Sequence, residues 1–185
     1  MKYTILESNE EPVTLEQIKE WLVIDHNHHD ELLNRLIKAS IRYVENFTGM
    51  SVVDRRWKIK TTPAEIGTGF ILAYNPVISI DSVEIDTHGE RVELTDDQYV
   101  FEVKETNSFI VVLDQTILRN AQDARATFVV EFTVDPNPVS DALRHGIIMM
   151  VAWYYENRGD TSDTYNNHIP PEVAAILESE RKAFV

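Results

Sequence analysis

The stretch Met150-Val151-Ala152-Trp153-Tyr154-Tyr155-Glu156-Asn157-Arg158-Gly159 begins as an apolar helix, becomes aromatic, and ends in charged and amide groups before glycine. Upstream, Ser140 and Asp141 offer short polar side chains that can cap the first backbone N–H groups of such a helix. Apolar residues recur at three- and four-residue steps and predict one buried stripe: Leu143, Ile147, Met150, Val151 and Tyr154. Gly159 suits the left-handed residue that ends a helix. The pattern predicts a core helix whose end presents aromatic and hydrogen-bonding groups together, as assembly contacts do.

Composition narrows the class of protein. The 185 residues fit one domain, or one domain with a large insertion, and can bury a substantial core. A hydrophobic content of 43% and a charged content of 26% are ordinary for a soluble globular protein. No apolar run approaches the roughly 20 residues of a membrane span, so we expect no membrane partner. The lack of cysteine excludes disulfides, thiolate metal sites and cysteine nucleophiles, and fits a reducing compartment.

The net charge of −14 argues against affinity for nucleic-acid phosphates, which normally requires a basic patch. Its distribution along the chain is uneven. Residues 81–105 hold nine acidic residues, Asp96 and Asp97 among them, against two basic ones. Residues 50–80 hold Arg55, Arg56, Lys58 and Lys60 against two acidic residues. Two interpretations are open: a solvated surface that gives solubility, or charge complementarity between subunits of a head-to-tail ring.

The N-terminal part is predicted to be helical. Thr14 followed by Gln17 fits a capping box that opens a helix through about Val23. A polar loop, Asp25-His26-Asn27-His28-His29, follows it. A second helix is predicted from Asp30 to Thr48, where Gly49 ends it. Its apolar residues recur at helical spacing: Leu33, Leu36, Ile37, Ile41, Val44 and Phe47.

The middle of the chain is predicted to form strands. Between Val52 and Lys60, the side chains of Arg56, Lys58 and Lys60 fall on one face, and those of Trp57 and Ile59 fall on the other. Further β patterns cover 78–85, 92–94, 99–103, 109–113 and 126–134. Pro136-Asn137-Pro138 ends this part.

The predicted fold class is α+β, with a helical core of about four helices around a central antiparallel β insertion. Residues 1–50 and 136–185 would form the two halves of the core, and residues 51–135 the insertion. A polar loop from Asp160 to His168, which we expect to be mobile in the isolated protein, precedes the Pro170-Pro171 start of the last helix.

The chain resembles the head–tail connector family of tailed bacteriophages, whose members complete the head and dock on the portal. The resemblance runs in the family's order over nearly the whole chain. It rests on five pieces: Val13 to Leu22 with the histidine-rich loop after it, Ala39 to Gly49, Pro76 to Val83, the Trp-Tyr-Glu-Asn-Arg helix end, and Pro170 to Val173. This chain departs from the family in an extra Tyr155 and in the long loop from Asp160 to His168.

The resemblance implies a structural virion protein at the head–tail junction, present in the host cytoplasm before assembly and free of enzymatic activity and cofactors. Its partners would be the portal protein, neighbouring copies of itself in a commonly dodecameric ring, and a downstream head-completion or tail protein. Genomic DNA would pass through the channel without specific binding. Nine residues are interface candidates: Arg56, Lys58, Lys60, Asp96, Asp97, Trp153, Tyr155, Asn157 and Arg158.

Three other readings of the residues are open. His26, His28 and His29 beside Asp25 and Asp30 contain metal-ligand types, although adjacent histidines splay apart and a polar interhelical loop explains the composition. Asp97 with Glu102-Val103-Lys104 matches a nuclease arrangement of acids and a lysine within a region rich in acids. Arg55 to Lys60 with Trp57 would suit a DNA-binding adaptor, but the alternation points Trp57 away from the basic side chains.

Overall fold

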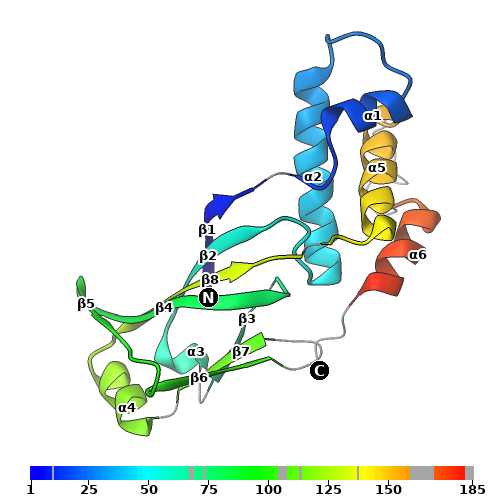
Figure 1. Ribbon diagram of the computed structural model, residues 1–185. Helices are drawn as coiled ribbons and strands as arrows, with labels where there is room; N and C mark the ends of the chain where they lie inside the picture. Colours follow the sequence, from blue (N-terminus) through cyan, green and yellow to red (C-terminus); the bar gives the residue numbers. More distant parts are fainter. Residues whose placement is uncertain are drawn as a thin grey trace. The chain divides into compact units, whose positions relative to one another are not determined.

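The structure is a computed structural model of the chain (Figure 1). It describes residues 1–9, 11–66, 69–72, 74–103, 108–112, 114–136, 138–158 and 169–181. Contacts within the chain separate two compact units. The β unit contains the described residues within Met1–Glu10 and Val53–Pro136, and the helical unit those within Glu11–Val52 and Asn137–Lys182.

The helical unit is built from helices at both ends of its sequence. They are α1 (Leu15–Trp21), α2 (Asp30–Thr48), α5 (Asp141–Glu156) and α6 (Pro171–Glu180). The predicted capping box is present, because the Thr14 hydroxyl accepts from the Gln17 backbone N–H and the Gln17 side chain accepts from that of Thr14. The Ser140 hydroxyl caps α5, and Gly49 ends α2 in the left-handed region at φ 70°. Local signals therefore set these boundaries as expected.

Helices α2 and α5 pack side by side, with α6 against both (Figure 1). The predicted stripe of α5 is buried at four of its five positions, Leu143, Ile147, Met150 and Val151. On α2, the core positions are Leu33, Ile37, Ile41 and Val44. Leu36 was expected in this core and is only half-buried, because the buried face of α2 is centred on Leu33 and Ile37 instead.

Gly146 is the point of close approach between α5 and α6. A methyl group built on it would lie 3.4 Å from Cγ2 of Ile176 and 3.8 Å from Cδ2 of Leu177. Val173 and Leu177 of α6 are fully buried. The small residue on α5 therefore lets the last helix seat closely on the core.

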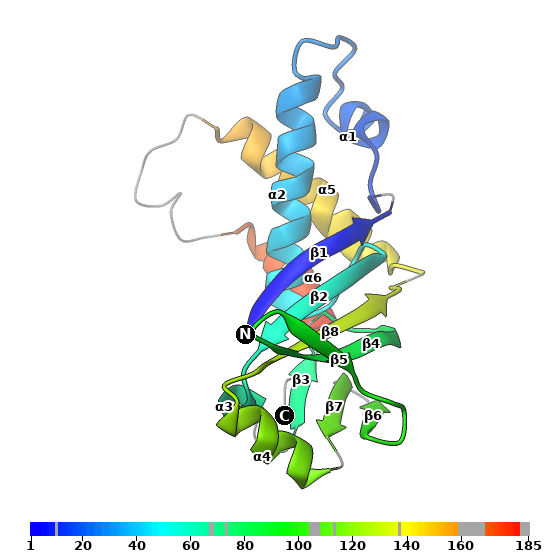
Figure 2. The same cartoon turned by 90° about the vertical axis from the view of Figure 1, so that its left-hand side faces the viewer.

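The β unit contains two antiparallel sheets. Its strands are β1 (Lys2–Ser8), β2 (Arg55–Thr61), β3 (Gly69–Leu72), β4 (Val77–Thr87), β5 (Glu90–Glu93), β6 (Tyr99–Val103), β7 (Ser108–Val112) and β8 (Thr127–Val134). The five-stranded sheet has the order β1-β2-β8-β4-β5, which can be followed in Figure 2, and the three-stranded sheet has the order β3-β7-β6. The observed fold is α+β, as predicted.

The inner face of the larger sheet forms the core of the β unit. Trp57 pairs in register with Phe132, and Ile59 with Val130. All four are buried, and the Trp57 ring stacks on Tyr74 with a centroid separation of 4.6 Å. The expected alternation of β2 is therefore correct: Trp57 and Ile59 point inward, away from the basic side chains.

Four elements of the β unit were not predicted: strands β1 and β3 and helices α3 (Pro63–Ile66) and α4 (Gln115–Asp123). Strand β1 has only Tyr3 half-buried and gains its order by pairing with β2 as an edge strand. Helices α3 and α4 lie in the β unit, in addition to the four helices that were expected in the helical core. Asp114 caps α4, because its carboxylate accepts from the backbone N–H and the hydroxyl of Thr116, and these bonds lower the pKa of Asp114.

None of the helices in the described part of the chain has the length and apolarity that crossing a membrane requires. The expected loop from Asp160 to His168 and the closing Gly159 lie outside the described residues.

Replacing Ile147 by alanine should destabilise the protein by about 2–5 kcal/mol, because the side chain is fully buried between packed helices. The same change at half-buried Leu36 should cost less than half as much. Urea unfolding followed by circular dichroism measures both, with exposed Lys38→Ala as the control, which should lie within about 0.5 kcal/mol of the parent. Equal losses at Ile147 and Leu36 would contradict the assigned core face of α2.

Candidate assembly surfaces

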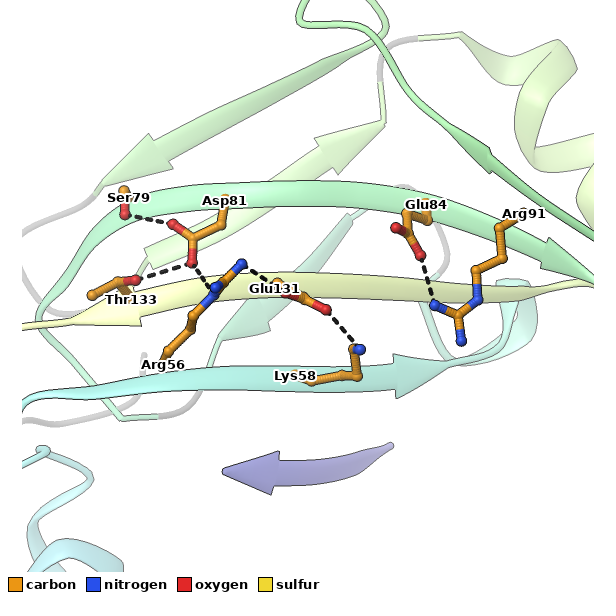
Figure 3. Close-up of polar contacts among 8 residues, drawn as sticks. All are labelled: Arg56, Lys58, Ser79, Asp81, Glu84, Arg91, Glu131 and Thr133. Atoms are coloured by element: carbon orange, nitrogen blue, oxygen red, sulfur yellow. Dashed lines mark hydrogen bonds and ion pairs between the residues drawn. The ribbon is translucent and has the colours of Figure 1, made fainter. Parts of the chain in front are cut away.

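The outer face of the five-stranded sheet carries a network of charged side chains (Figure 3). Arg56 Nη2 lies 2.9 Å from Glu131 Oε2, and Arg56 Nε lies 3.0 Å from Asp81 Oδ2. Lys58 Nζ lies 2.6 Å from Glu131 Oε1. The carboxylate of Asp81 also accepts from the hydroxyls of Ser79 at 2.9 Å and Thr133 at 3.0 Å. Two of the predicted interface cations are thus paired with carboxylates of β4 and β8.

A second group of ion pairs lies between β4 and β5. Arg91 Nη1 is 3.3 Å from Glu84 Oε2 (Figure 3). Arg91 Nε is 3.5 Å from Asp86 Oδ2. Arg91 therefore neutralises part of the acidic stretch within its own subunit. The sequence separates a basic strand from an acidic region, but the sheet places the start of that region on β4, one strand away from β2 and within reach of Arg56.

The other charged candidates on the β unit are exposed. Lys60 is exposed on β2 and lies between Lys2 of β1 and Val129 of β8 in the register. Asp96 and Asp97 are exposed in the turn before β6, and Asp96 accepts from the Tyr99 hydroxyl at 3.2 Å. Burial and this hydrogen bond to Asp96 raise the pKa of Tyr99. Lys60, Asp96 and Asp97 remain interface candidates.

The aromatic end of α5 makes contacts within its own unit. The Tyr155 hydroxyl lies 2.5 Å from Nδ1 of His29, the residue that precedes α2. Asn157 Nδ2 donates to the Trp153 carbonyl at 2.8 Å, and Arg158 Nη1 donates to the Tyr155 carbonyl at 2.7 Å. The Arg158 guanidinium also lies over the Tyr155 ring, 4.5 Å from its centroid. These side chains close the helix end, and their expected role in an interface stays a prediction.

The structure does not assemble the alternative sites. The ring of His26 lies 5.3 Å from that of His28 and 5.1 Å from that of His29, between centroids. Among the described residues, no group of three or more histidines and acids is arranged to hold a metal ion. Of the nuclease-like residues, Asp97 and Glu102 are exposed, and Lys104 lies outside the described residues.

The structure removes the aromatic group that the DNA-binding hypothesis for the basic strand requires. Trp57 is 6% exposed and belongs to the core, so its ring cannot stack on a base. Arg56 and Lys58 are engaged by carboxylates that would repel phosphate.

Sequence reasoning missed two exposed apolar residues at the end of α1. Trp21 is 51% exposed and Val23 is 89% exposed. The sequence does offer one signal: Val23 stands just after the end of the helix, at the position where glycine or asparagine is preferred.

The comparisons with known proteins place the chain in a family. It belongs to the head completion protein family, whose profile matches residues 11–183. No curated protein matches the sequence.

Three solved structures share the fold. One, described as the virion of a native gene transfer agent particle, has a TM-score of 0.77 at 18% identity. A second, the neck of an empty particle computed with C6 symmetry, has 0.76 at 17%. A third, the neck of a native particle computed with C12 symmetry, has 0.72 at 18%. Each alignment covers 100% of this chain and 97% of the other.

The ion pair between Arg56 and Glu131 should be measurable as a coupling. Arg56→Ala and Glu131→Ala together should cost less than the sum of the single changes, by about 0.5–1 kcal/mol at low salt. Urea unfolding at low and high salt measures this, and the coupling should shrink with salt because the pair is partly exposed. Arg91→Ala combined with Glu131→Ala, which are not paired, is the control. Strict additivity for Arg56 and Glu131 would show that the pair does not form in solution.

Tyr155→Phe should destabilise the helical unit by about 0.5–1.5 kcal/mol, because it removes the hydroxyl that contacts His29. Thermal unfolding of the variant against the parent measures this. Tyr43→Phe is the matched control, since the Tyr43 ring stacks on Phe47 and keeps that contact in the variant. A stability unchanged in both variants would contradict the bond to His29.

Proposed function

We propose that this protein is a structural head–tail connector, which forms a ring under the portal, extends the DNA channel and joins the capsid to the tail. The observation that carries the proposal is the head completion family match across residues 11–183. The likeness to chains in gene transfer agent necks, which covers the whole chain, supports a place at the head–tail junction.

The symmetry of those particles supports a ring of copies. One neck was computed with C6 symmetry and one with C12, both of which place repeated copies around an axis. A subunit that meets its neighbour through two different surfaces closes into such a ring. We propose twelve copies in the particle, with the portal on one side and a further head-completion or tail protein on the other.

The charge of the protein suits a channel component. At a net charge of −14, the subunit repels phosphate on average. A basic wall would hold the genome by releasing counterions, whereas an acidic wall lets it slide. We propose that the DNA passes without specific binding and that the protein performs no catalysis.

The test uses native mass spectrometry of the purified chain with and without a portal protein. The expected result is a complex in which many copies of the chain bind one portal ring, and electron microscopy should place them beneath the portal. A chain that never associates with the portal or with itself, at any ratio, would overturn the connector assignment.

A gel-shift assay with duplex DNA tests the expected lack of affinity. We expect no shift even at low salt, because non-specific binding depends on neutralising phosphates with cations. A lysine-rich protein of similar size serves as the positive control. A salt-dependent shift of the free chain would favour the DNA-binding adaptor instead.

A further inference from the structure

The end of α1 holds a residue that its backbone does not favour. Val23 has φ 56°, in the left-handed region. Its N–H donates to the Glu20 carbonyl at 3.2 Å, and the N–H of Ile24 donates to the Lys19 carbonyl at 2.8 Å. This is the paired hydrogen bonding of a Schellman motif, whose left-handed position normally belongs to glycine. A β-branched residue there is strained.

Within the described part of the chain, Val23 gains little packing to offset that strain. The Val23 side chain is 89% exposed, so it buries little apolar surface in its own chain. Trp21, two residues earlier, is 51% exposed, and its ring forms a T-shaped pair with the ring of the exposed His145, with 5.4 Å between centroids. We call Trp21 and Val23 the apolar knob. A strained residue with an exposed apolar side chain suits a contact made outside the subunit.

The charges beside the knob are negative. Glu16 and Glu20 are exposed and stand one helical turn apart on α1. The nearest cation on this helix, Lys19, is engaged by Asn27 at 2.6 Å and by Asp30 at 3.0 Å. The knob therefore lies beside an acidic face made of Glu16 and Glu20.

A complementary surface lies on α2 of the same chain. Arg35, Lys38 and Arg42 are exposed and follow one another at three- and four-residue steps, so they form one basic stripe. Within the described part of the chain, none of these three forms an ion pair. Next to the stripe on the helix surface lie the exposed Ala39 and the half-buried Tyr43. The stripe thus offers positive charge with apolar surface beside it.

We propose that the apolar knob and acidic face of one copy dock on the basic stripe of α2 in a neighbouring copy. The two surfaces differ, so the contact is head-to-tail, which is the kind that closes a ring. The acidic face and the basic stripe carry opposite charges, which favours contact between them in two neighbouring copies. The proposal rests on the connector function above, because it supplies the contact between copies that the ring requires.

Val23→Gly separates this role from a purely structural one. Glycine relieves the left-handed backbone, so the isolated chain should melt at a higher temperature than the parent. The same change removes the knob's apolar side chain, so assembly should become about tenfold weaker. Native mass spectrometry with the portal protein measures assembly, and Val92→Gly, at an exposed valine of β5, is the matched control. A variant that is more stable and assembles as well as the parent would overturn the proposal.

Charge reversal identifies the partner surface. Chains with Glu16→Lys and Glu20→Lys, or with Lys38→Glu and Arg42→Glu, should each fail to assemble alone, since both of their docking surfaces then carry the same sign. A mixture of the two chains should assemble, because each surface again meets its opposite. Circular dichroism confirms that each variant is folded.

The outcomes also separate this proposal from the connector function. If the parent and both charge-reversed chains all form rings, the proposed docking surface is refuted and the connector function is not. A second outcome is that the mixture of the two reversed chains does not assemble and that only the variant with Lys38→Glu and Arg42→Glu loses binding to the portal. This outcome would assign the basic stripe to the portal and refute the contact between copies. A parent that never assembles would instead refute the connector function.

Discussion

Helices α2 and α5 bury their apolar stripes against each other although the whole β segment separates them in the sequence. This contact closes a long loop of chain that contains most of the β unit. The entropy cost of closing such a loop grows only slowly with the number of residues in it. Fully buried Leu33, Ile147 and Met150 supply apolar burial against that cost. The other helices of the unit depend on this pair. Helix α1 packs on both, and α6 seats on α5 at Gly146.

The acidity of the chain is a poor guide to the charges that another molecule would meet. On the sheet, Arg56, Lys58 and Arg91 are each held by carboxylates of neighbouring strands. In the helical unit, by contrast, the basic residues of α2 point outward without ion pairs to the described residues. Cations that already have partners contribute less to a new contact, because their existing ion pairs must be broken first. The exposed helical charges are therefore the stronger candidates for recognition.

The predicted elements succeed where local chemistry is unambiguous. The capping box at Thr14, the serine cap of α5 and the glycine end of α2 all operate as expected. Strand β1 escaped prediction because its side chains are almost all exposed, and its order comes from pairing with β2. Leu36 was misplaced because helical spacing alone defines a stripe but not its centre, which depends on the direction from which α5 approaches.

The sequence by itself determined the α+β class, the main boundaries of the core helices and the inward direction of Trp57, because caps and apolar periodicity act over a few residues. Its family-like order of motifs also indicated the head–tail connector class. Only the tertiary structure decided which charges are satisfied. The pairing of β2 with β8, and of β8 with β4, brings Arg56 to Asp81 and Glu131 from distant parts of the chain. Exposure likewise belongs to the folded chain: Val23 and Arg42 became candidate contacts because the packing of their helices leaves their side chains outside.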